Sequence, residues 1–386
     1  MNDSIVIKNG RVVTPTDVLE SGEIEIRGDR IHHVGATPSR SVSADVVDAR
    51  GLVVMPGLID LHGDDIEHHL HPRTNASVET RVAVGMADRS NAASGVTTKF
   101  HAISFEELPE SNRTVAEATE TARAIADADD LLVDNRVHAR CELSDPSVEA
   151  VTDLLGSIPI DLVSIMHHTA GDGQLSDDDA FSELYVSEKG CNEAEATRLL
   201  DARRSTSTET LRRRAAEITD AALEAGAAVA SHDDERAEDV ERMADLGVEI
   251  TEFPVSMEAA ERAAELGLTT VMGAPNLVRG GSLWDNLSAE RAIDVGVLDV
   301  LSSDYHPVSL LSAVFVETGE SLPRRVRRVT KNPADAVGLT DRGRIREGAR
   351  ADLIVVDPEP TPTVELVLVG GCERFRTNAV GREAGR

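Results

Sequence analysis

The chain has 386 residues, enough for a barrel of about 250 residues and a smaller second domain. Hydrophobic residues make up 41% of it and aromatic residues only 2%, so a large core would be built from Ala, Val, Leu and Ile. The formal net charge of −30 argues against nucleic acid or an anionic membrane as a partner, because an acidic surface repels both.

Both ends of the chain have the pattern of short β-strands. Residues 4–13, 22–35 and 45–51 are alternating runs separated by turn residues such as Asn9-Gly10. The same pattern returns at 351–357 and 364–371. We therefore expect one small β-sandwich domain built from residues 1–52 and 341–386.

The middle of the chain, residues 53–340, alternates strand-like apolar runs with helical segments such as 114–128 and 209–226. Eight runs fit strands, at 57–62, 95–103, 136–143, 161–168, 227–233, 248–254, 269–275 and 298–304. Strands that alternate with helices in this way indicate an α/β fold, the (β/α)8 TIM barrel. In that fold the active site lies at the carboxyl ends of the strands.

Ligand-type side chains stand at the ends of five of these runs. They are His62, Asp64, Glu142, His168, His232 and Asp304. Alternate residues of a strand share a face, so His62 and Asp64 point the same way. In the run 136–143 the apolar residues occupy one face, and His138, Arg140 and Glu142 occupy the other. Each residue alone would more often be a loop or capping residue, but the set on matching faces predicts a site.

Imidazole and carboxylate groups are the ligands of zinc and related divalent cations. The sequence therefore predicts one or two divalent ions, with zinc the first expectation and manganese or magnesium also suited. A pair of such ions can share a hydroxide and polarise a phosphoryl or carbonyl oxygen. Asp304 is the candidate general base, because a carboxylate beside the attacking water can accept its proton.

Cysteine use and the N-terminal segment bear on the compartment. Cys141, Cys191 and Cys372 are scattered and form no CxxC pair, which fits a reducing compartment. Residues 1–15 have neither the basic nor the apolar part of a signal peptide. Lysine is scarce among many acidic residues, a composition typical of a halophile-like acidic surface. We expect a cytoplasmic protein.

Several motifs resemble those of the amidohydrolase superfamily, namely "VVMPGLIDLHGD", "SSDYHP", "TKNPADAVGL" and "DRGRIREGARADLIVVD". A second set resembles the α-D-ribose 1-methylphosphonate 5-triphosphate diphosphatase family of the carbon–phosphorus lyase pathway, namely "HARCEL", "LVSIMHHTAGDGQ", "ASHDDE", "EFPVSMEAA" and "VMGAPNLVRGGS". The likeness covers nearly the whole chain. The HxD formed by His62 and Asp64, in place of the superfamily's usual HxH, is specific to this branch.

The resemblance implies a metal-bearing barrel that hydrolyses a ribose 5-triphosphate. Pyrophosphate leaves, and 5-phospho-α-D-ribose 1-methylphosphonate remains. The six ligand-type residues are the implied metal site, and Asp304 stays the candidate catalytic residue. The substrate-binding candidates are Arg279, Gly280, Gly281, Lys189, Arg73 and Tyr305. Glycines beside Arg279 would let backbone N–H groups approach a phosphate closely.

Two features depart from the superfamily pattern. His168 and His232 follow the fourth and fifth predicted strands, whereas the superfamily commonly uses the fifth and sixth. The usual bridging lysine is absent from the run 161–166, and Glu142 is the candidate for that role.

Two other interpretations stay open at this point. The chain could catalyse another amidohydrolase reaction, as a cyclic amidase or a nucleobase deaminase, or it could be a non-catalytic barrel scaffold. The expected partner is the small-molecule ribose triphosphate, with no nucleic acid and no membrane, and we expect a homo-oligomer.

Overall fold

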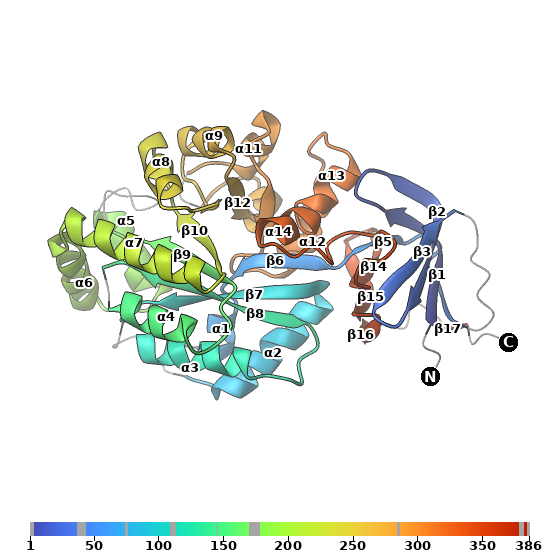
Figure 1. Cartoon of the computed structure of the whole chain (residues 1–386), viewed down its shortest axis with the longest axis horizontal. Coiled ribbons are helices and arrows are strands. Elements are labelled where there is room, and N and C mark those ends of the chain that lie inside the picture. The colour runs from blue at the N-terminus through green and yellow to red at the C-terminus, as the bar shows by residue number, and fades with distance from the viewer. Residues whose placement is uncertain are drawn as a thin grey trace.

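The structure is a computed structural model that describes residues 4–36, 44–73, 76–108, 113–144, 146–169, 178–283, 286–377 and 382–383. It contains an eight-stranded sheet and a nine-stranded sheet. Figure 1 shows the first among helices and the second at the other end of the molecule, where both chain termini lie. This arrangement confirms the predicted α/β class, with a barrel and a small β-structure made from both termini.

The nine-stranded sheet is mixed and combines the two ends of the chain. Its strands are β1 (Ser4–Val13), β2 (Val18–Arg27), β3 (Arg30–Gly35), β4 (Asp45–Asp48), β5 (Val53–Pro56), β14 (Leu353–Asp357), β15 (Thr363–Val369), β16 (Cys372–Arg376) and β17 (Arg382–Glu383). β5 joins the ends, because it pairs parallel with β1 and antiparallel with β14. Ile7, Ile24 and Leu366 belong to the core on one face of this sheet. Domain boundaries at residues 52 and 341 stay a prediction.

The eight-stranded sheet is parallel, and neighbouring strands follow one another along the chain. Its strands are β6 (Leu58–Gly63), β7 (Val96–Phe105), β8 (Asp134–Glu142), β9 (Leu162–Met166), β10 (Ala228–His232), β11 (Ile250–Glu252), β12 (Thr269–Gly273) and β13 (Val300–Ser302). Each lies within or overlaps one predicted run. Val137, Ala139 and Cys141 of β8 join the apolar cluster between strands and helices, as their alternation predicts.

Helices follow most barrel strands. They are α1 (Ile66–Leu70), α2 (Thr80–Ala93), α3 (Val115–Ala126), α4 (Ser147–Leu155), α5 (Asp178–Glu183), the π-helical segment η2 (Leu184–Glu188), α6 (Glu193–Ser205), α7 (Thr208–Glu224), α8 (Ala237–Asp245), α9 (Met257–Leu266), α10 (Ala274–Arg279), α11 (Ala289–Val295), α12 (Val308–Val314), α13 (Leu322–Arg327) and α14 (Lys331–Ala336). The hydroxyls of Thr114 and Ser207 cap α3 and α7, the two helices that the sequence predicts. Within the described ranges, no helix is long and apolar enough to cross a bilayer.

The first and last barrel strands meet at Asp304. The backbone N–H of Asp304 donates to the His62 carbonyl at 2.9 Å, and the N–H of Asp64 donates to the Asp304 carbonyl at 3.0 Å. Gly63 and Asp304 form a parallel bridge there. The seam that closes the barrel therefore fixes three of the predicted site residues beside one another.

A buried lysine lies directly beneath this seam. Lys99 Nζ is 2.7 Å from Asp60 Oδ2 and 2.6 Å from Asp65 Oδ1. The backbone N–H of Ser303 donates to Asp60 Oδ1 at 2.9 Å, which ties β13 to β6. Burial disfavours the charged ammonium of Lys99, but the two aspartates outweigh burial and raise its pKa. Gly63 is required here, because a Cβ at that position would lie 1.7 Å from Lys99 Nζ.

Replacing Lys99 should destabilise the barrel. Lys99→Met would leave Asp60 and Asp65 buried without a counter-charge, and we expect it to lower the free energy of unfolding by about 3–5 kcal/mol. Urea unfolding followed by circular dichroism measures this change. Lys331→Met is the matched control, because Lys331 pairs with Asp335 one turn away on α14, closer to solvent. The control should cost less than about 0.5 kcal/mol, and equal losses in the two variants would contradict the account.

Candidate metal centre

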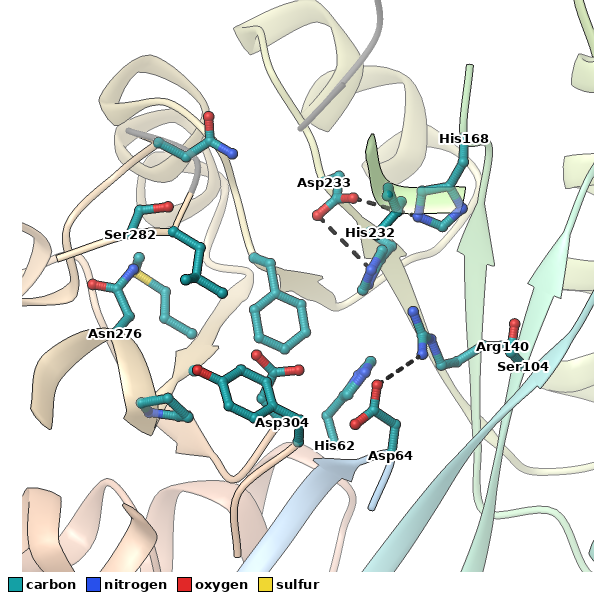
Figure 2. A pocket seen from close by; sticks show the side chains of 18 of the residues that line it. His62, Asp64, Ser104, Arg140, His168, His232, Asp233, Asn276, Ser282 and Asp304 are labelled. Atoms are coloured by element: carbon teal, nitrogen blue, oxygen red, sulfur yellow. Dashed lines mark ion pairs between the residues drawn. The ribbon is translucent and has the colours of Figure 1, made fainter. Parts of the chain in front are cut away.

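A cavity of about 640 Å³ opens at the carboxyl ends of the barrel strands. Five of the six predicted metal ligands line it, namely His62, Asp64, His168, His232 and Asp304. Figure 2 shows these side chains together with Asp233 and Arg140, and with Asn276 and Ser282 across the cavity. The structure therefore brings together residues that lie up to 242 positions apart (304 − 62 = 242) in the sequence.

One group of potential ligands comes from the ends of β6, β10 and β11. His62, His232 and Glu252 offer atoms that all lie within 4.8 Å of one another. Glu252 Oε2 is 3.2 Å from His62 Nδ1 and 3.6 Å from His232 Nδ1. The two imidazole rings stack with their centroids 5.5 Å apart. This geometry presents two nitrogens and a carboxylate to one point.

A second group overlaps the first at His232. His168, His232 and Asp233 also offer atoms within 4.8 Å of one another. His168 Nε2 is 3.6 Å from Asp233 Oδ2, and His232 Nε2 is 3.8 Å from Asp233 Oδ1. The two groups lie side by side, as two neighbouring cation positions would require.

The donor atoms of these groups fit a bound divalent cation. His62 Nδ1, His232 Nδ1, Asp233 Oδ2 and Glu252 Oε1 are buried, and none has a hydrogen-bond partner in the described part of the chain. Buried polar atoms without partners are costly, and a cation would satisfy them. Burial lowers the pKa of His62 to about 3, so its imidazole is neutral, the form that binds metals. Mixed nitrogen and oxygen donors suit zinc and related ions.

Two carboxyl groups at the seam, those of Asp64 and Asp304, have raised pKa values. Burial and the neighbouring carboxylate of Asp64 together raise the pKa of Asp304 to about 8. Burial also raises the pKa of Asp64, although Arg140 opposes this effect with Nη1 at 3.6 Å from Asp64 Oδ2. Since both carboxyl groups disfavour ionisation in this cavity, a cation that binds there gains from relieving their repulsion.

Three non-glycine residues of the site have left-handed backbones. Asp233, Phe253 and Asp304 have φ of 59°, 54° and 55°. Each comes one or two residues after the end of a barrel strand, where the chain turns into the cavity wall. A backbone of this kind is costly for residues with a side chain, and such strain concentrates at functional sites.

Glu142, the sixth predicted ligand, does not line the cavity. Its Oε2 is 3.0 Å from His168 Nδ1, and it also accepts a hydrogen bond from the His168 backbone N–H at 3.0 Å. Burial disfavours its charge, but Arg203 and the hydrogen bonds from His167 and His168 hold its pKa well below the ordinary value. In this structure Glu142 therefore orients His168 so that Nε2 faces the cavity.

The predicted substrate-binding residues divide into two groups. Arg279, Tyr305 and Lys189 line the cavity. Arg279 donates to the Tyr305 hydroxyl at 3.3 Å and to the Gly281 carbonyl at 2.7 Å. Gly280, Gly281 and Arg73 are not among the lining residues; Gly280 ends α10 with φ of 85°, and Arg73 is exposed. Roles in substrate binding stay predictions for all six.

The sequence reasoning did not identify Glu252 and Asp233 as ligand candidates. Glu252 lies near the end of the predicted strand 248–254 and is the last residue of β11, so an acidic residue near a strand end is the available signal. Asp233 directly follows His232 and would point away from it in a regular strand, but its left-handed backbone turns it into the site. His138, which the alternation places on the same face as Arg140 and Glu142, is fully buried, and its Nδ1 lies 2.9 Å from the Leu61 carbonyl oxygen.

The model of the Amidohydrolase family matches residues 191–371. The chain is 32% identical over 360 residues to the α-D-ribose 1-methylphosphonate 5-triphosphate diphosphatase of Escherichia coli strain K12, covering 91% of this chain and 94% of that protein. It is also 33% identical over 132 residues to the dihydroorotase of Lactococcus lactis subsp. lactis, covering 34% of this chain and 28% of that protein.

Solved structures share the fold at low sequence identity. A prolidase complexed with N-methylphosphonate-L-proline superposes with a TM-score of 0.64 at 18% identity, over 97% of this chain and 100% of that one. A D-hydantoinase from a Bacillus species has a TM-score of 0.63 at 16% identity, over 99% of this chain and 97% of that one. With its barrel, its histidine and carboxylate groups and its nearly full-length relative, the chain belongs to the amidohydrolase superfamily of hydrolases, in the family of the α-D-ribose 1-methylphosphonate 5-triphosphate diphosphatase of E. coli.

Proposed function

We propose that this hydrolase is a metal-dependent diphosphatase that converts α-D-ribose 1-methylphosphonate 5-triphosphate to 5-phospho-α-D-ribose 1-methylphosphonate and pyrophosphate in phosphonate catabolism. The observation that carries the proposal is the 32% identity to the E. coli enzyme over 91% of this chain and 94% of that protein. A match over nearly all of both chains extends well beyond the segments shared with dihydroorotases.

The charge of the cavity supports a polyphosphate substrate. In a chain of net charge −30, the cavity is lined by the cations Arg113, Arg140, Lys189 and Arg279, beside five carboxyl groups whose charge a bound divalent cation would offset in part. A triphosphate is repelled by the protein as a whole, so it needs local positive charge of this kind to bind. Arginine in particular matches the geometry of phosphate oxygens.

The residues of the cavity supply the parts of such a hydrolysis. His62, His168 and His232 would hold the cation together with carboxylates drawn from Asp64, Asp233, Glu252 and Asp304. When bound, a divalent cation lowers the pKa of water and neutralises charge on a phosphoryl group. Asp304 would accept the proton of the attacking water, as the general base at the seam of the barrel. The metal is zinc by first expectation, and manganese or magnesium would also suit these donors.

Hydrolysis of a cyclic amide is the second candidate. The local matches to dihydroorotases favour it, since the Lactococcus relative is 33% identical over 34% of this chain. The four cations that line the cavity favour the diphosphatase, because a triphosphate carries several negative charges and dihydroorotate carries a single carboxylate. Ring opening of dihydroorotate, followed by absorbance, distinguishes the two candidates from pyrophosphate release.

The remaining expectations stay proposals. The acidic surface disfavours binding to nucleic acid and to anionic membranes. The proposed partner is the small-molecule ribose triphosphate. A cytoplasmic location and a homo-oligomeric state are proposed on composition and on the sequence pattern alone, and analytical ultracentrifugation of the purified chain would test the oligomeric state.

Hydrolysis in oxygen-18 water tests the proposed reaction. Phosphorus NMR should show pyrophosphate without label and the ribose 5-phosphate product with one labelled oxygen, because water attacks the phosphorus nearest the ribose. His232→Ala should abolish turnover, since His232 belongs to both ligand groups. His32→Ala is the matched control on β3, far from the cavity. Label in pyrophosphate, or release of orthophosphate instead, would refute the proposed reaction.

Metal binding should displace protons and strengthen as the pH rises. In the metal-free protein the pKa of Asp304 is about 8, so its carboxyl is protonated below that pH and must lose the proton to bind a cation. Burial lowers the pKa of His168, but the carboxylates of Asp233 and Glu142 outweigh burial and raise it to about 9. We expect zinc affinity to rise about tenfold per pH unit for each displaced proton between pH 6 and 8.

Isothermal titration calorimetry in buffers of different ionisation enthalpy counts the released protons. Asp304→Asn should reduce the count. Asp299→Asn is the matched control, because burial also raises the pKa of Asp299 but this residue lies outside the cavity. Zinc affinity that does not change with pH in the wild type would show that these groups do not bind the ion.

A further inference from the structure

The cations of the cavity occupy two places. Arg279 lies at the end of α10 with the Tyr305 hydroxyl 3.3 Å away. The others gather around Asp64 and Glu67: Arg140 Nη1 is 3.6 Å from Asp64, and Arg113 Nη2 is 2.8 Å from Glu67. Arg113 also donates to the backbone carbonyl of Lys189 at 2.9 Å. Positive charge is thus concentrated on the side where β8 and the end of η2 border the cavity.

Arg140 is the cation of this group whose donors are least satisfied. The residue is only 7% exposed, and its Nε and Nη1 are buried without a hydrogen-bond partner among the residues that the structure describes. Its 3.6 Å contact with Asp64 is too long for a hydrogen bond. A guanidinium is always charged and presents five donors, so idle buried donors indicate that an acceptor is missing.

Arg140 has a small neighbour on the side of the cavity. On β8 its neighbours in register are Ser104 on β7, which lines the cavity, and Ser164 on β9, whose hydroxyl donates to Glu252. Figure 2 shows Arg140 next to Ser104, with its guanidinium directed toward Asp64. Lys189 also lines the cavity, where its charge opposes the effect of burial and lowers the pKa of the carboxyl groups of Asp64, Glu67 and Glu106. The cavity wall therefore carries one buried planar cation, with donors that are unpartnered within the described ranges, and one half-buried ammonium.

We propose that Arg140 and Lys189 form the subsite for the two phosphoryl groups that leave as pyrophosphate. This inference rests on the proposed function. Hydrolysis joins the water oxygen to the phosphorus nearest the ribose and breaks the bond from that phosphorus to the bridging oxygen. The electron pair of the broken bond leaves with pyrophosphate, and Asp304 takes the proton of the water. Arg140 neutralises the charge that develops on the leaving oxygen, in the way that arginine forks bind phosphate.

Arg140 should bind pyrophosphate only when a metal ion is bound at the site. A cation held by Asp64 would take up the negative charge that now faces Arg140, so Arg140 would then need another anion. The other wall combines apolar side chains with hydrogen-bonding groups that suit a hydroxylated sugar, namely Phe253, Met272, Pro275 and Tyr305 beside Asn276, Ser282 and Arg279. The substrate would thus lie with its terminal phosphates toward β8 and its sugar toward α10.

Binding of inorganic pyrophosphate to the metal-loaded protein tests the subsite. Arg140→Gln and Lys189→Gln should each weaken pyrophosphate binding about tenfold or more, while the affinity for 5-phospho-α-D-ribose 1-methylphosphonate stays within about twofold. Arg140→Lys keeps the positive charge but loses the two-pronged hydrogen bonding of the guanidinium group. Its affinity for pyrophosphate should therefore lie between those of Arg140→Gln and the wild type. Calorimetry measures the affinity of each variant for pyrophosphate and for the ribose product. The metal content of each variant is checked as well. The Lys189→Gln result stands even if Arg140→Gln fails to fold, because Lys189 is only half-buried.

Arg136→Gln is the matched control. Arg136 lies on the same face of β8 but at the other end of the barrel, where it pairs with Asp134 at 3.1 Å. It should bind pyrophosphate like the wild type. Unchanged pyrophosphate affinity in the folded Arg140 and Lys189 variants would overturn the subsite, even if the wild type hydrolyses the triphosphate. The opposite result is that the wild type does not hydrolyse the triphosphate but binds pyrophosphate in a way that depends on Arg140. That result would refute the proposed reaction and leave the subsite standing.

Discussion

The burial of neighbouring carboxylates, and the repulsion between Asp64 and Asp304, are the constraint on which this site depends. Asp64, Asp233, Glu252 and Asp304 crowd the mouth of the barrel, and the pKa of Asp304 rises to about 8 because its charge is disfavoured there. The neutral imidazole of His62 cannot cancel that repulsion, and Arg140 Nη1 lies 3.6 Å from Asp64 Oδ2. A divalent cation would offset the negative charge of the carboxylates. It would also give a partner to the Nδ1 atoms of His62 and His232, which lack a hydrogen bond within the described part of the chain.

The frame that holds these groups is the seam of the barrel. Backbone hydrogen bonds between His62, Asp64 and Asp304 place the two competing carboxylates on adjacent strands, and buried Lys99 beneath them ties Asp60 and Asp65 together. Glycine at position 63 makes room for that lysine. Stability and chemistry are therefore linked here, because the contacts that close the barrel also fix the distance between the charged groups.

Much of this arrangement could be predicted from the sequence, because strand alternation and residue type are local properties. Alternation located all eight barrel strands and placed His62, His168, His232 and Asp304 at one end. Local reasoning could not foresee that Glu142 would bond to His168 Nδ1, which depends on register between β8 and β9. It also missed Asp233, whose left-handed backbone breaks the alternation on which the method relies.

Cations should bind where His62, His168 and His232 converge, at the ends of β6, β9 and β10. X-ray diffraction from crystals grown with zinc, collected on both sides of the zinc absorption edge, locates the ion directly. The account predicts anomalous density at about 2.0–2.2 Å from a His232 nitrogen and from carboxylate oxygens of the same cavity. Fully occupied zinc elsewhere on the molecule, with none at the mouth of the barrel, would contradict it.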